Sequence, residues 1–507
     1  GRAGTGKTTF LRNVQETVKK QFVILAPTGV AAILAGGQTI HSFFGLPLGI
    51  CDSDTIGVIN KSKFGIIYNA DTIIIDEVSM VRCDIIDAID RTLRKTLRTP
   101  KPFGGKQIVF VGDVFQLPPV VTSKAERENL IDLYHTDEFF FFNANVIQKM
   151  GLAKIEFTKV YRQNDDSDYR HILENVRMNK MTDEDLLLLN SRVAKPSSSD
   201  GLIITLTTIN KTADRVNEQK LKEIPSEEMV YEGKLEGKFE SQRFPADLHL
   251  VLKVGAQVML THNDPYRRWG NGTLCTVECL EDKLVQVKLQ NGQVCSVSQA
   301  TWSSYNYEYD PKKHKLTKRL TGRFTQYPLR LAWAITVHKS QGMTFDKMEF
   351  DLSRGLFVPG QLYVALSRVR SLSGLFLSKP IAIRYANTDR EVLLYAKGYN
   401  DTDAIQSAIE SGKAVFDLLR NGDDDAAARQ YLLLTEKKVL AHNLQEATQL
   451  AQCFLNTVVS DEELVGCVKE MPDGLLPENH LSTKFLTAMF CLYAGAHEKA
   501  VRLANDV

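Results

Sequence analysis

The chain has 507 residues, of which 43% are hydrophobic and 24% are charged, and its formal net charge is +1. This composition is ordinary for a globular protein, and the length suggests about three to four structural units. No apolar run approaches the ~20 residues that span a bilayer and no signal peptide opens the chain, so we expect no membrane partner. The near-neutral charge does not indicate a nucleic-acid binder, although a binding groove needs only a local basic lining.

The eight cysteines include no C-x-x-C pair. Cys275 and Cys279 lie in a strand-like stretch without suitable histidine partners, so the free thiols of an intracellular protein are favoured over a zinc site. No targeting signal is visible in the sequence. The expected compartment is the cytoplasm or nucleoid of a bacterium, or the nucleus or mitochondrion of a eukaryote.

The first eight residues, Gly1 to Thr8, match the phosphate-binding pattern G-x-x-x-x-G-K-[ST]. The glycines allow main-chain N–H groups to surround an anion, Lys7 reaches the β- and γ-phosphates, and Thr8 offers its hydroxyl to Mg²⁺. The residues expected to contact the nucleotide here are Gly4, Thr5, Gly6, Lys7, Thr8 and Thr9. A phosphate loop follows a buried strand, so we expect that strand and the residues that recognise the base to precede Gly1. The alternative is a glycine-rich turn that caps a helix.

Acidic residues follow a second apolar run, Ile73 to Ile75. Open α/β sheets bind ligands at the carboxyl ends of their strands, so Asp76 and Glu77 are expected at such an edge. Asp76 is suited to hold Mg²⁺ through water, and Glu77 to polarise the attacking water. A third run, residues 107–111, leads to Gln116, which is placed to sense the γ-phosphate unless this loop is a proline-stiffened connection. Together with the phosphate loop, these residues predict an ATPase.

Strands and helices alternate in two stretches of the chain, which predicts two α/β units. The first ends with a strand-like stretch at 153–157 that leads to Arg162, and the second begins near residue 201. Between about 230 and 318 the pattern changes to short strands, and Asn291-Gly292 predicts a hairpin turn between two of them. We therefore expect a small β-barrel inserted in the second unit.

The strand–helix alternation resumes at 329–336, and a helix from Gly360 presents Arg368 at its end. From about residue 397 onward the pattern is purely helical. Residues 493–500 resemble part of a tetratricopeptide repeat, but no period is sustained, so an irregular helical bundle is the alternative.

Eight stretches, in order and with family-like spacing, resemble the helicase motifs of the Pif1 family within superfamily 1B. They are the phosphate loop and residues 26–32, 39–44, 76–80, 112–119, 160–163, 337–345 and 363–369. The resemblance spans roughly residues 1–395 and implies an α/β fold with two RecA-like P-loop domains. The implied boundaries are 1–160 for the first domain with a wedge insertion at about 46–68, 161–230 and 319–395 for the second, 231–318 for an SH3-like β-barrel insertion, and 396–507 for a helical C-terminal domain.

The resemblance also implies an activity. It is ATP-driven 5′→3′ translocation on single-stranded DNA with unwinding of duplex DNA, in DNA replication and repair, with G-quadruplexes as a further candidate substrate. The implied cofactors are ATP and Mg²⁺, and the implied partners are single-stranded DNA and single-strand/duplex junctions. A monomer is expected, with the helical C-terminal region as a candidate surface for a protein partner.

The residues that match the family's motifs take their expected roles from it. The expected catalytic residues are Lys7, Glu77, Gln116 and the two arginine fingers Arg162 and Arg368. Thr8 and Asp76 are expected to hold the metal, and Gln341 and Gly342 to contact the nucleotide. The expected DNA-binding residues are Pro27, Thr28, His41, Phe43, Thr208, Asn210, His338 and Lys339.

Two other functions remain open at this point. One is a RecD-like motor subunit of a nuclease complex, although no cluster of acids in the sequence resembles a nuclease site. The other is a regulatory P-loop ATPase with a helical interaction domain. The second α/β unit and its Arg368 argue against that reading, because a switch of this kind needs a single nucleotide domain.

Overall fold

The computed structural model describes residues 1–18, 20–52, 61–121, 123–163, 166–197, 201–239, 244–310, 315–403 and 405–406. Among these residues no helix has the length and apolar character needed to cross a membrane. The helical region expected over 396–507 lies outside the described residues from 407 onward, and so do residues 53–60 of the expected wedge.

The first α/β unit is built on a parallel sheet with the strand order β2-β1-β3-β4. Its strands are β1 (Phe22–Ala26), β2 (Gln38–Thr39), β3 (Thr72–Ile75) and β4 (Gln107–Phe110). Successive side chains of a strand point to opposite faces. Ile24 and Ile74 therefore pack with Leu11 on one face, whereas Ile73 and Ile75 join the main core on the other.

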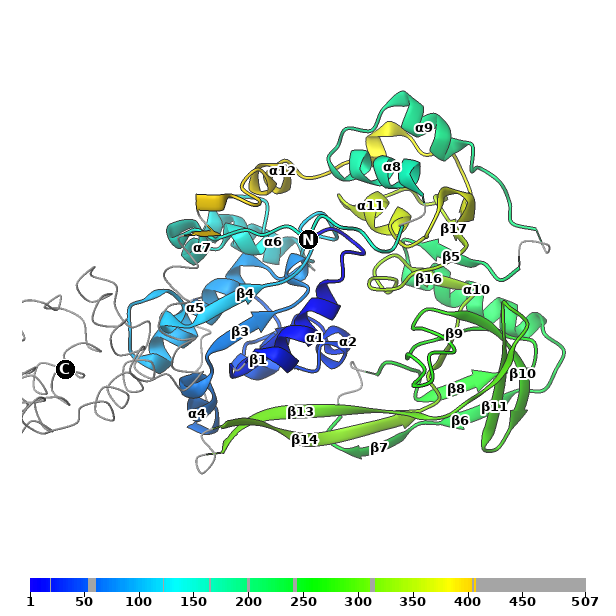
Figure 1. The fold of residues 1–507 in the computed structure, drawn as a ribbon, viewed down its shortest axis with the longest axis horizontal. Coiled ribbons are helices and arrows are strands. Elements are labelled where there is room, and N and C mark those ends of the chain that lie inside the picture. The colour runs from blue at the N-terminus through cyan, green and yellow to red at the C-terminus, as the bar shows by residue number, and fades with distance from the viewer. Residues whose placement is uncertain are drawn as a thin grey trace, which may run out of the picture.

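Helices cover both faces of this sheet (Figure 1). They are α1 (Lys7–Thr17), α2 (Gly29–Leu34), α3 (Ile40–Phe44), α4 (Lys61–Asn69), α5 (Cys83–Leu97), α6 (Lys124–Tyr134) and α7 (Asn145–Met150). Leu11 of α1 packs in the small cluster with Ile24 and Ile74. Helix α5 places Ile86 and Ile89, both fully buried, in the main core. Burial on both faces explains why the two central strands, β1 and β3, consist largely of apolar residues.

A second parallel sheet has the order β16-β5-β17-β18. Its strands are β5 (Ile204–Thr207), β16 (Ala334–Thr336), β17 (Met348–Phe350) and β18 (Leu375–Leu377). The helices of this part of the chain are α8 (Ser167–Arg177), α9 (Asp183–Asn190), α10 (Asn210–Glu223), α11 (Gln361–Leu366) and α12 (Arg390–Ala396). The two α/β units predicted by the sequence are therefore both present (Figure 1).

Between β5 and β16 the chain forms antiparallel sheets, as the short strands predicted. One sheet has the order β12-β11-β10-β9-β15, and β6 pairs with β8. These strands are β6 (Met229–Glu232), β8 (His249–Leu252), β9 (Gln257–Leu260), β10 (Leu274–Glu281), β11 (Leu284–Leu289), β12 (Val294–Val297) and β15 (Leu329–Leu331). The turn expected at Asn291-Gly292 joins β11 to β12, and Gly292 adopts the left-handed φ of 84° that such turns require.

The stretch 329–336 was expected to belong to the second parallel sheet, and this is wrong for its first half. Leu329 pairs with Leu260 of β9 in the antiparallel sheet, and only the part from Ala334 onward pairs with β5. The chain crosses from one sheet to the other at Ala332, whose N–H donates to the Gln257 carbonyl at 3.1 Å. Both halves are apolar, so composition alone could not separate them.

A long hairpin links the antiparallel unit to the first α/β unit (Figure 1). It consists of β13 (Ala300–Asp310) and β14 (Lys315–Gln326), and β7 (Lys234–Gly237) pairs with β14. The Ile24 N–H donates to the Tyr307 hydroxyl at 2.9 Å. Strand β2 pairs only with Leu25 and Ala26, so it is too short to satisfy this buried N–H of β1. The hairpin therefore supplies the hydrogen-bond acceptor that β2 does not provide for strand β1 of the first sheet.

We expect Tyr307→Phe to lower the free energy of unfolding by about 1–3 kcal/mol, because the buried Ile24 N–H loses its acceptor. Urea denaturation followed by circular dichroism measures this change. Tyr305→Phe, on the same strand and with no hydrogen bond from its hydroxyl to the described residues, is the matched control and is expected to change stability by less than about 0.5 kcal/mol. Equal stability of the Tyr307 variant and the wild type would show that the hairpin does not dock on β1 in solution.

Candidate nucleotide site and strand-binding loops

The phosphate loop has the backbone geometry that anion binding requires. Gly4 and Gly6 adopt left-handed φ angles of 73° and 80°, which favour glycine at both positions. The Lys7 ammonium donates to the carbonyl oxygens of Gly1 and Arg2, both at 2.8 Å, and so spans the loop from the first turn of α1. Burial lowers the pKa of Lys7, and the charges of Asp113 and Glu77 partly oppose this shift. A phosphate in the loop would stabilise the buried ammonium.

The segment 151–163 lies across the phosphate loop, although it is not the strand expected at 153–157. The Tyr161 N–H donates to the Gly4 carbonyl at 2.9 Å. A Cβ atom on Gly4 would lie 2.7 Å from the Arg162 Cβ, so only glycine allows this approach. The chain is held here by the phosphate loop and by Asn400, whose N–H donates to the Lys154 carbonyl at 2.8 Å. An apolar run alone could not reveal these partners.

The two acids after β3 lie in the same site. The Glu77 N–H donates to Asp76 Oδ1 at 2.9 Å, and Glu77 itself has a left-handed φ of 50°. Burial raises the pKa of Asp76. Burial and the neighbouring Asp76 charge raise the pKa of Glu77, while Lys7 and Arg368 act in the opposite direction. Glu77 is thus a half-buried carboxylate with a raised pKa, which suits a general base.

Asp113 is a site residue to which the sequence analysis gave no role. It is 2% exposed and accepts hydrogen bonds from Gln116 Nε2 and the Tyr363 hydroxyl, both at 3.2 Å. Burial alone would raise its pKa, but Lys7 and Arg177 hold the pKa below its ordinary value. Its position just after a strand of the sheet, like that of Asp76, was the available signal. Asp113 joins the first sheet to α11 of the second unit.

The two arginines predicted as fingers both lie near the phosphate loop. The Arg162 guanidinium donates to the Ser367 carbonyl at 2.9 Å, and burial together with the nearby Arg368 lowers the pKa of Arg162 to about 9. Arg368 is 1% exposed and donates through Nε to the Val364 carbonyl at 2.9 Å. Burial lowers its pKa as well, against the charges of Glu77 and Asp113. Cations crowded in this way are suited to a highly charged anion.

Gln116 also contacts the second unit. Gln341 Nε2 donates to Gln116 Oε1 at 3.5 Å. A Cβ atom on Gly360 would lie 2.9 Å from the Gln116 carbonyl oxygen, so the backbones before α11 and after β4 are closely packed. Gly342 is exposed, and no atom lies within 4 Å of where its Cβ would be. Gln341 is therefore at the contact between the units, while Gly342 faces open space.

The DNA-binding residues expected in the first unit follow neighbouring strands. Ala26 of β1 pairs with Thr39 of β2, so the residues that come next, Pro27 and His41, begin at one edge of the sheet. Thr28 caps α2, its hydroxyl accepting the Ala31 N–H at 3.3 Å.

Phe43 does not fit the role of a base-stacking side chain in this structure. Its ring is 1% exposed and packs edge-on against Phe44 and against Tyr307 of the hairpin, with centroids 5.0 and 6.1 Å away. On a helix as short as α3, a buried aromatic and an exposed one cannot be told apart by sequence position. Phe43 serves the core.

The DNA-binding residues expected in the second unit are arranged in the same way. Thr207 of β5 pairs with Thr336 of β16, which brings the following residues, Thr208 and His338, to one edge. The buried Thr208 hydroxyl has no hydrogen-bond partner in the described structure. Asn210 opens α10, whose N-terminus has no side-chain cap, and Lys339 is exposed. Free N–H groups and a hydroxyl at such an edge suit a phosphate.

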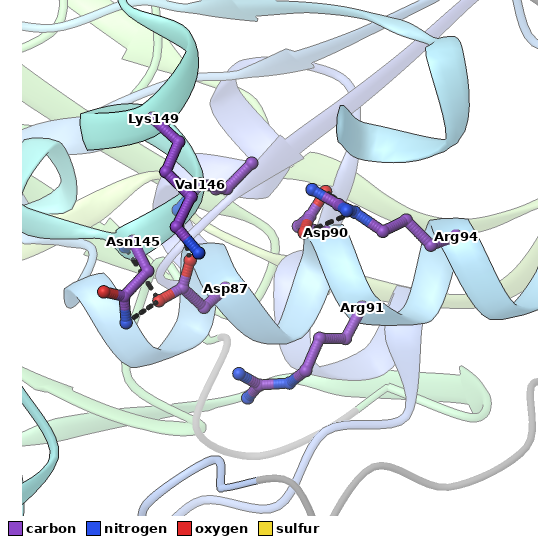
Figure 2. Close-up of a pocket in the computed structure, with 7 residues that line it drawn as sticks. All are labelled: Asp87, Asp90, Arg91, Arg94, Asn145, Val146 and Lys149. Carbon is purple, nitrogen blue, oxygen red and sulfur yellow. Dashed lines mark hydrogen bonds and ion pairs between the residues drawn. The ribbon is translucent and has the colours of Figure 1, made fainter. Parts of the chain in front are cut away.

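A cavity of about 210 Å³ lies between α5 and α7 (Figure 2). Its lining residues are Asp87, Asp90, Arg91, Arg94, Asn145, Val146 and Lys149. Asp87 accepts from the N–H groups of Asn145 and Val146, both at 2.9 Å, and Asp90 pairs with Arg94 at 2.8 Å. The acids are therefore occupied, and none of the residues predicted for catalysis or DNA binding lines this cavity.

Comparison with known proteins places the chain in a family. Residues 1–185 match the family model described as PIF1-like helicase. The chain is 34% identical over 387 residues to the ATP-dependent DNA helicase Pif1 of Bdellovibrio bacteriovorus, covering 74% of this chain and 82% of that protein. It is 33% identical over 425 residues to the ATP-dependent DNA helicase PIF1 of Danio rerio, covering 79% of this chain and 63% of that longer protein.

Solved structures agree with this assignment. The crystal structure of Bacteroides sp Pif1 in complex with ADP-AlF4 superposes with a TM-score of 0.74 at 39% identity, covering 80% of this chain and 93% of that one. Bacteroides Pif1 bound to ssDNA superposes with a TM-score of 0.57 at 40% identity and the same coverage. On these matches the chain belongs to the PIF1-like helicase family and is an ATP-hydrolysing helicase.

Proposed function

We propose that this protein is an ATP- and Mg²⁺-dependent DNA helicase that moves 5′→3′ along single-stranded DNA and unwinds the duplex ahead of it. The observation that carries the proposal is the position of Arg162 and Arg368. Arg162 packs directly on Gly4 of the phosphate loop, and its guanidinium donates to the carbonyl of Ser367, the residue before Arg368. Both arginines come from the part of the chain beyond the first sheet. A nucleotide bound at Lys7 would therefore be sensed by the two α/β units together.

The residues of the phosphate site divide the chemical work. Lys7 and the loop N–H groups bind the phosphates, Glu77 orients the attacking water and accepts its proton, and Arg162 and Arg368 stabilise the charge of the transition state. An arginine finger contributes about 10³–10⁵-fold in rate. Gln116 and Asp113, which contact Gln341 and Tyr363, couple the nucleotide to the second unit.

Thr8 and Asp76 fit a magnesium ion that is shared with the nucleotide. Mg²⁺ binds through one or two protein oxygens together with phosphates and waters. The described residues contain no group of three acids, histidines or cysteines that could hold a metal without such help. The half-buried Asp76 carboxylate has a raised pKa that a cation would lower. When bound, Mg²⁺ neutralises the charge that develops on the phosphate oxygens.

Single-stranded DNA would bind along one edge of each of the two parallel sheets. Pro27, Thr28 and His41 belong to one edge, and Thr208, Asn210, His338 and Lys339 to the other. Closure on ATP and opening after hydrolysis would change the distance between the two edges and advance the strand. The solved Bacteroides structures differ according to the bound strand: the unliganded protein and its ADP-AlF4 complex superpose on this chain with TM-scores of 0.72 and 0.74, and two complexes that contain ssDNA with 0.57 and 0.55. The antiparallel unit is our candidate for the SH3-like insertion.

The direction of movement is tested by strand displacement on matched duplexes that carry a single-stranded tail at either the 5′ or the 3′ end. With ATP and Mg²⁺, the 5′-tailed duplex is expected to unwind at least about tenfold faster, because a motor with fixed polarity reaches the duplex from one side only. The wild-type chain without ATP is the control. Equal rates, or a preference for the 3′ tail, would contradict the proposed direction, and no unwinding of either substrate would contradict helicase activity of this chain.

A further inference from the structure

The loop between β9 and β10, residues 261–273, carries an ordered group of aromatic and basic side chains. Asp264 is 6% exposed and holds Arg268 at three points. Its Oδ2 accepts the Arg268 N–H at 2.9 Å and Nε at 3.0 Å, and its Oδ1 accepts Nη2 at 2.7 Å. A bidentate pair of this kind fixes both the position and the plane of the guanidinium.

The fixed guanidinium supports two aromatic rings. It lies 4.4 Å from the centroid of Trp269 and 5.5 Å from the centroid of Tyr266. Tyr266 is nevertheless 81% exposed, one of the most exposed large apolar side chains in the described structure. An aromatic ring that is exposed to water contributes little to the stability of the fold, so packing in the core does not explain why a tyrosine stands at this position. One face of the ring meets a cation while the rest is accessible to a flat ligand.

The base of the loop packs against a segment that is predicted to bind single-stranded DNA. A Cβ atom on Gly272 would lie 3.5 Å from both the Met343 Cβ and the Thr344 carbonyl oxygen, so the loop packs directly against the segment that follows His338 and Lys339. Two buried oxygen atoms at this end of the loop, Thr261 Oγ1 and Asn271 Oδ1, have no hydrogen-bond partner within the described residues. Polar atoms of this kind are usually paired, and a ligand or water would pair them.

We propose that Tyr266, supported by Arg268 and Trp269, is a stacking site for a base of single-stranded DNA, and that it extends the strand's path from His338 and Lys339 onto the antiparallel unit. The proposal rests on the proposed function. Stacking on an aromatic ring tolerates any base sequence, and the arginine adds cation–π and phosphate attraction. The exposed Arg267 beside Tyr266 gives the tip of the loop a positive charge, which complements a polynucleotide.

Fluorescence anisotropy of a labelled oligo(dT) with the full chain, at fixed salt and without nucleotide, tests the site. Tyr266→Ala is expected to raise the Kd by about 5- to 150-fold, the value of one base–aromatic stack. Tyr266→Phe keeps the ring and is expected to bind within about twofold of the wild type. Val294→Ala is the matched control, since it alters an exposed apolar residue on β12 at the far edge of the same sheet.

A second substrate separates stacking from other contacts. On an abasic oligonucleotide of the same length, the wild type and Tyr266→Ala are expected to bind equally, because the backbone remains and the bases are gone. Equal affinity of Tyr266→Ala and the wild type for oligo(dT) would overturn the site while leaving the proposed function intact. If Tyr266→Phe binds oligo(dT) as weakly as Tyr266→Ala, the stacking site would also be overturned, because the tyrosine hydroxyl and not the ring would then make the contact with DNA. A wild type that binds no strand would overturn the proposed function and this site with it.

Discussion

Replacing Glu77 with glutamine is expected to lower the rate of ATP hydrolysis by about 10²–10⁴-fold, the usual contribution of a general base. Glutamine has nearly the same shape and can occupy the same left-handed backbone position after β3, but it cannot accept the proton of the attacking water. Binding of ATP depends on Lys7 and the loop, so the affinity for nucleotide is expected to change by less than about threefold. Single-turnover hydrolysis and equilibrium binding of a fluorescent ATP analogue measure the two quantities.

The control for this variant is Glu128→Gln, which removes an acid from the exposed face of α6. Glu128 is 61% exposed and, among the described residues, forms an ion pair with Lys124 of the same helix. Its turnover should match that of the wild type. If the Glu77 variant hydrolyses ATP at a rate near the wild-type rate, another group activates the water. Asp113 would then be the first residue to test, because its side chain is buried and it also lies near Lys7.

Arg368→Ala is expected to lower ATP turnover by about 10³-fold or more, while the affinity for nucleotide falls by less than about tenfold. The reason is that a finger contributes chiefly to the transition state, where charge moves on the γ-phosphate. The side chain is also buried and bonded to Val364 and Ser367, so the variant is expected to lose some stability. Thermal unfolding in the same buffer separates a loss of folded protein from a loss of catalysis.

Two further variants make the test of Arg368 decisive. Arg368→Lys keeps a buried cation but lacks the planar fork, so it should recover stability more than turnover. Arg370→Ala removes an exposed arginine two positions away, which pairs with Asp346 at 3.0 Å on the surface, and should leave turnover unchanged. A folded Arg368→Ala protein with wild-type turnover would remove Arg368 from the site.

The parts of the fold that the sequence predicted are those that local patterns determine. Ile73 to Ile75 could only be a buried strand, and the acids that follow it had to lie at the sheet edge. The turn at Asn291-Gly292 required a left-handed φ at Gly292, which glycine adopts without strain. The helix before Arg368 was likewise readable from its short apolar run, and α11 ends at Leu366, two residues before the arginine.

The parts that the sequence did not predict depend on partners far along the chain. Phe43 is buried because Tyr307 of the hairpin reaches it. Residues 153–157 form no strand, and their partners are the phosphate loop at Phe157 and the distant Asn400 at Lys154. The hairpin itself left a signal in the alternating aromatics Tyr305, Tyr307 and Tyr309, but nothing local indicates that they pack on β1. Asp113 has a role only once Tyr363, far away in sequence, lies beside it.

The strand order of the second parallel sheet has a consequence for how the protein is made. Thr205 pairs with Ala334, and the entire antiparallel unit is synthesised between these two residues. The neighbouring strands β10, β11 and β12 can pair as soon as they leave the ribosome, whereas β5 must wait for β16 and β17 to emerge. We expect β5 to stay unpaired during this interval, which makes it the segment of a nascent chain most in need of a chaperone.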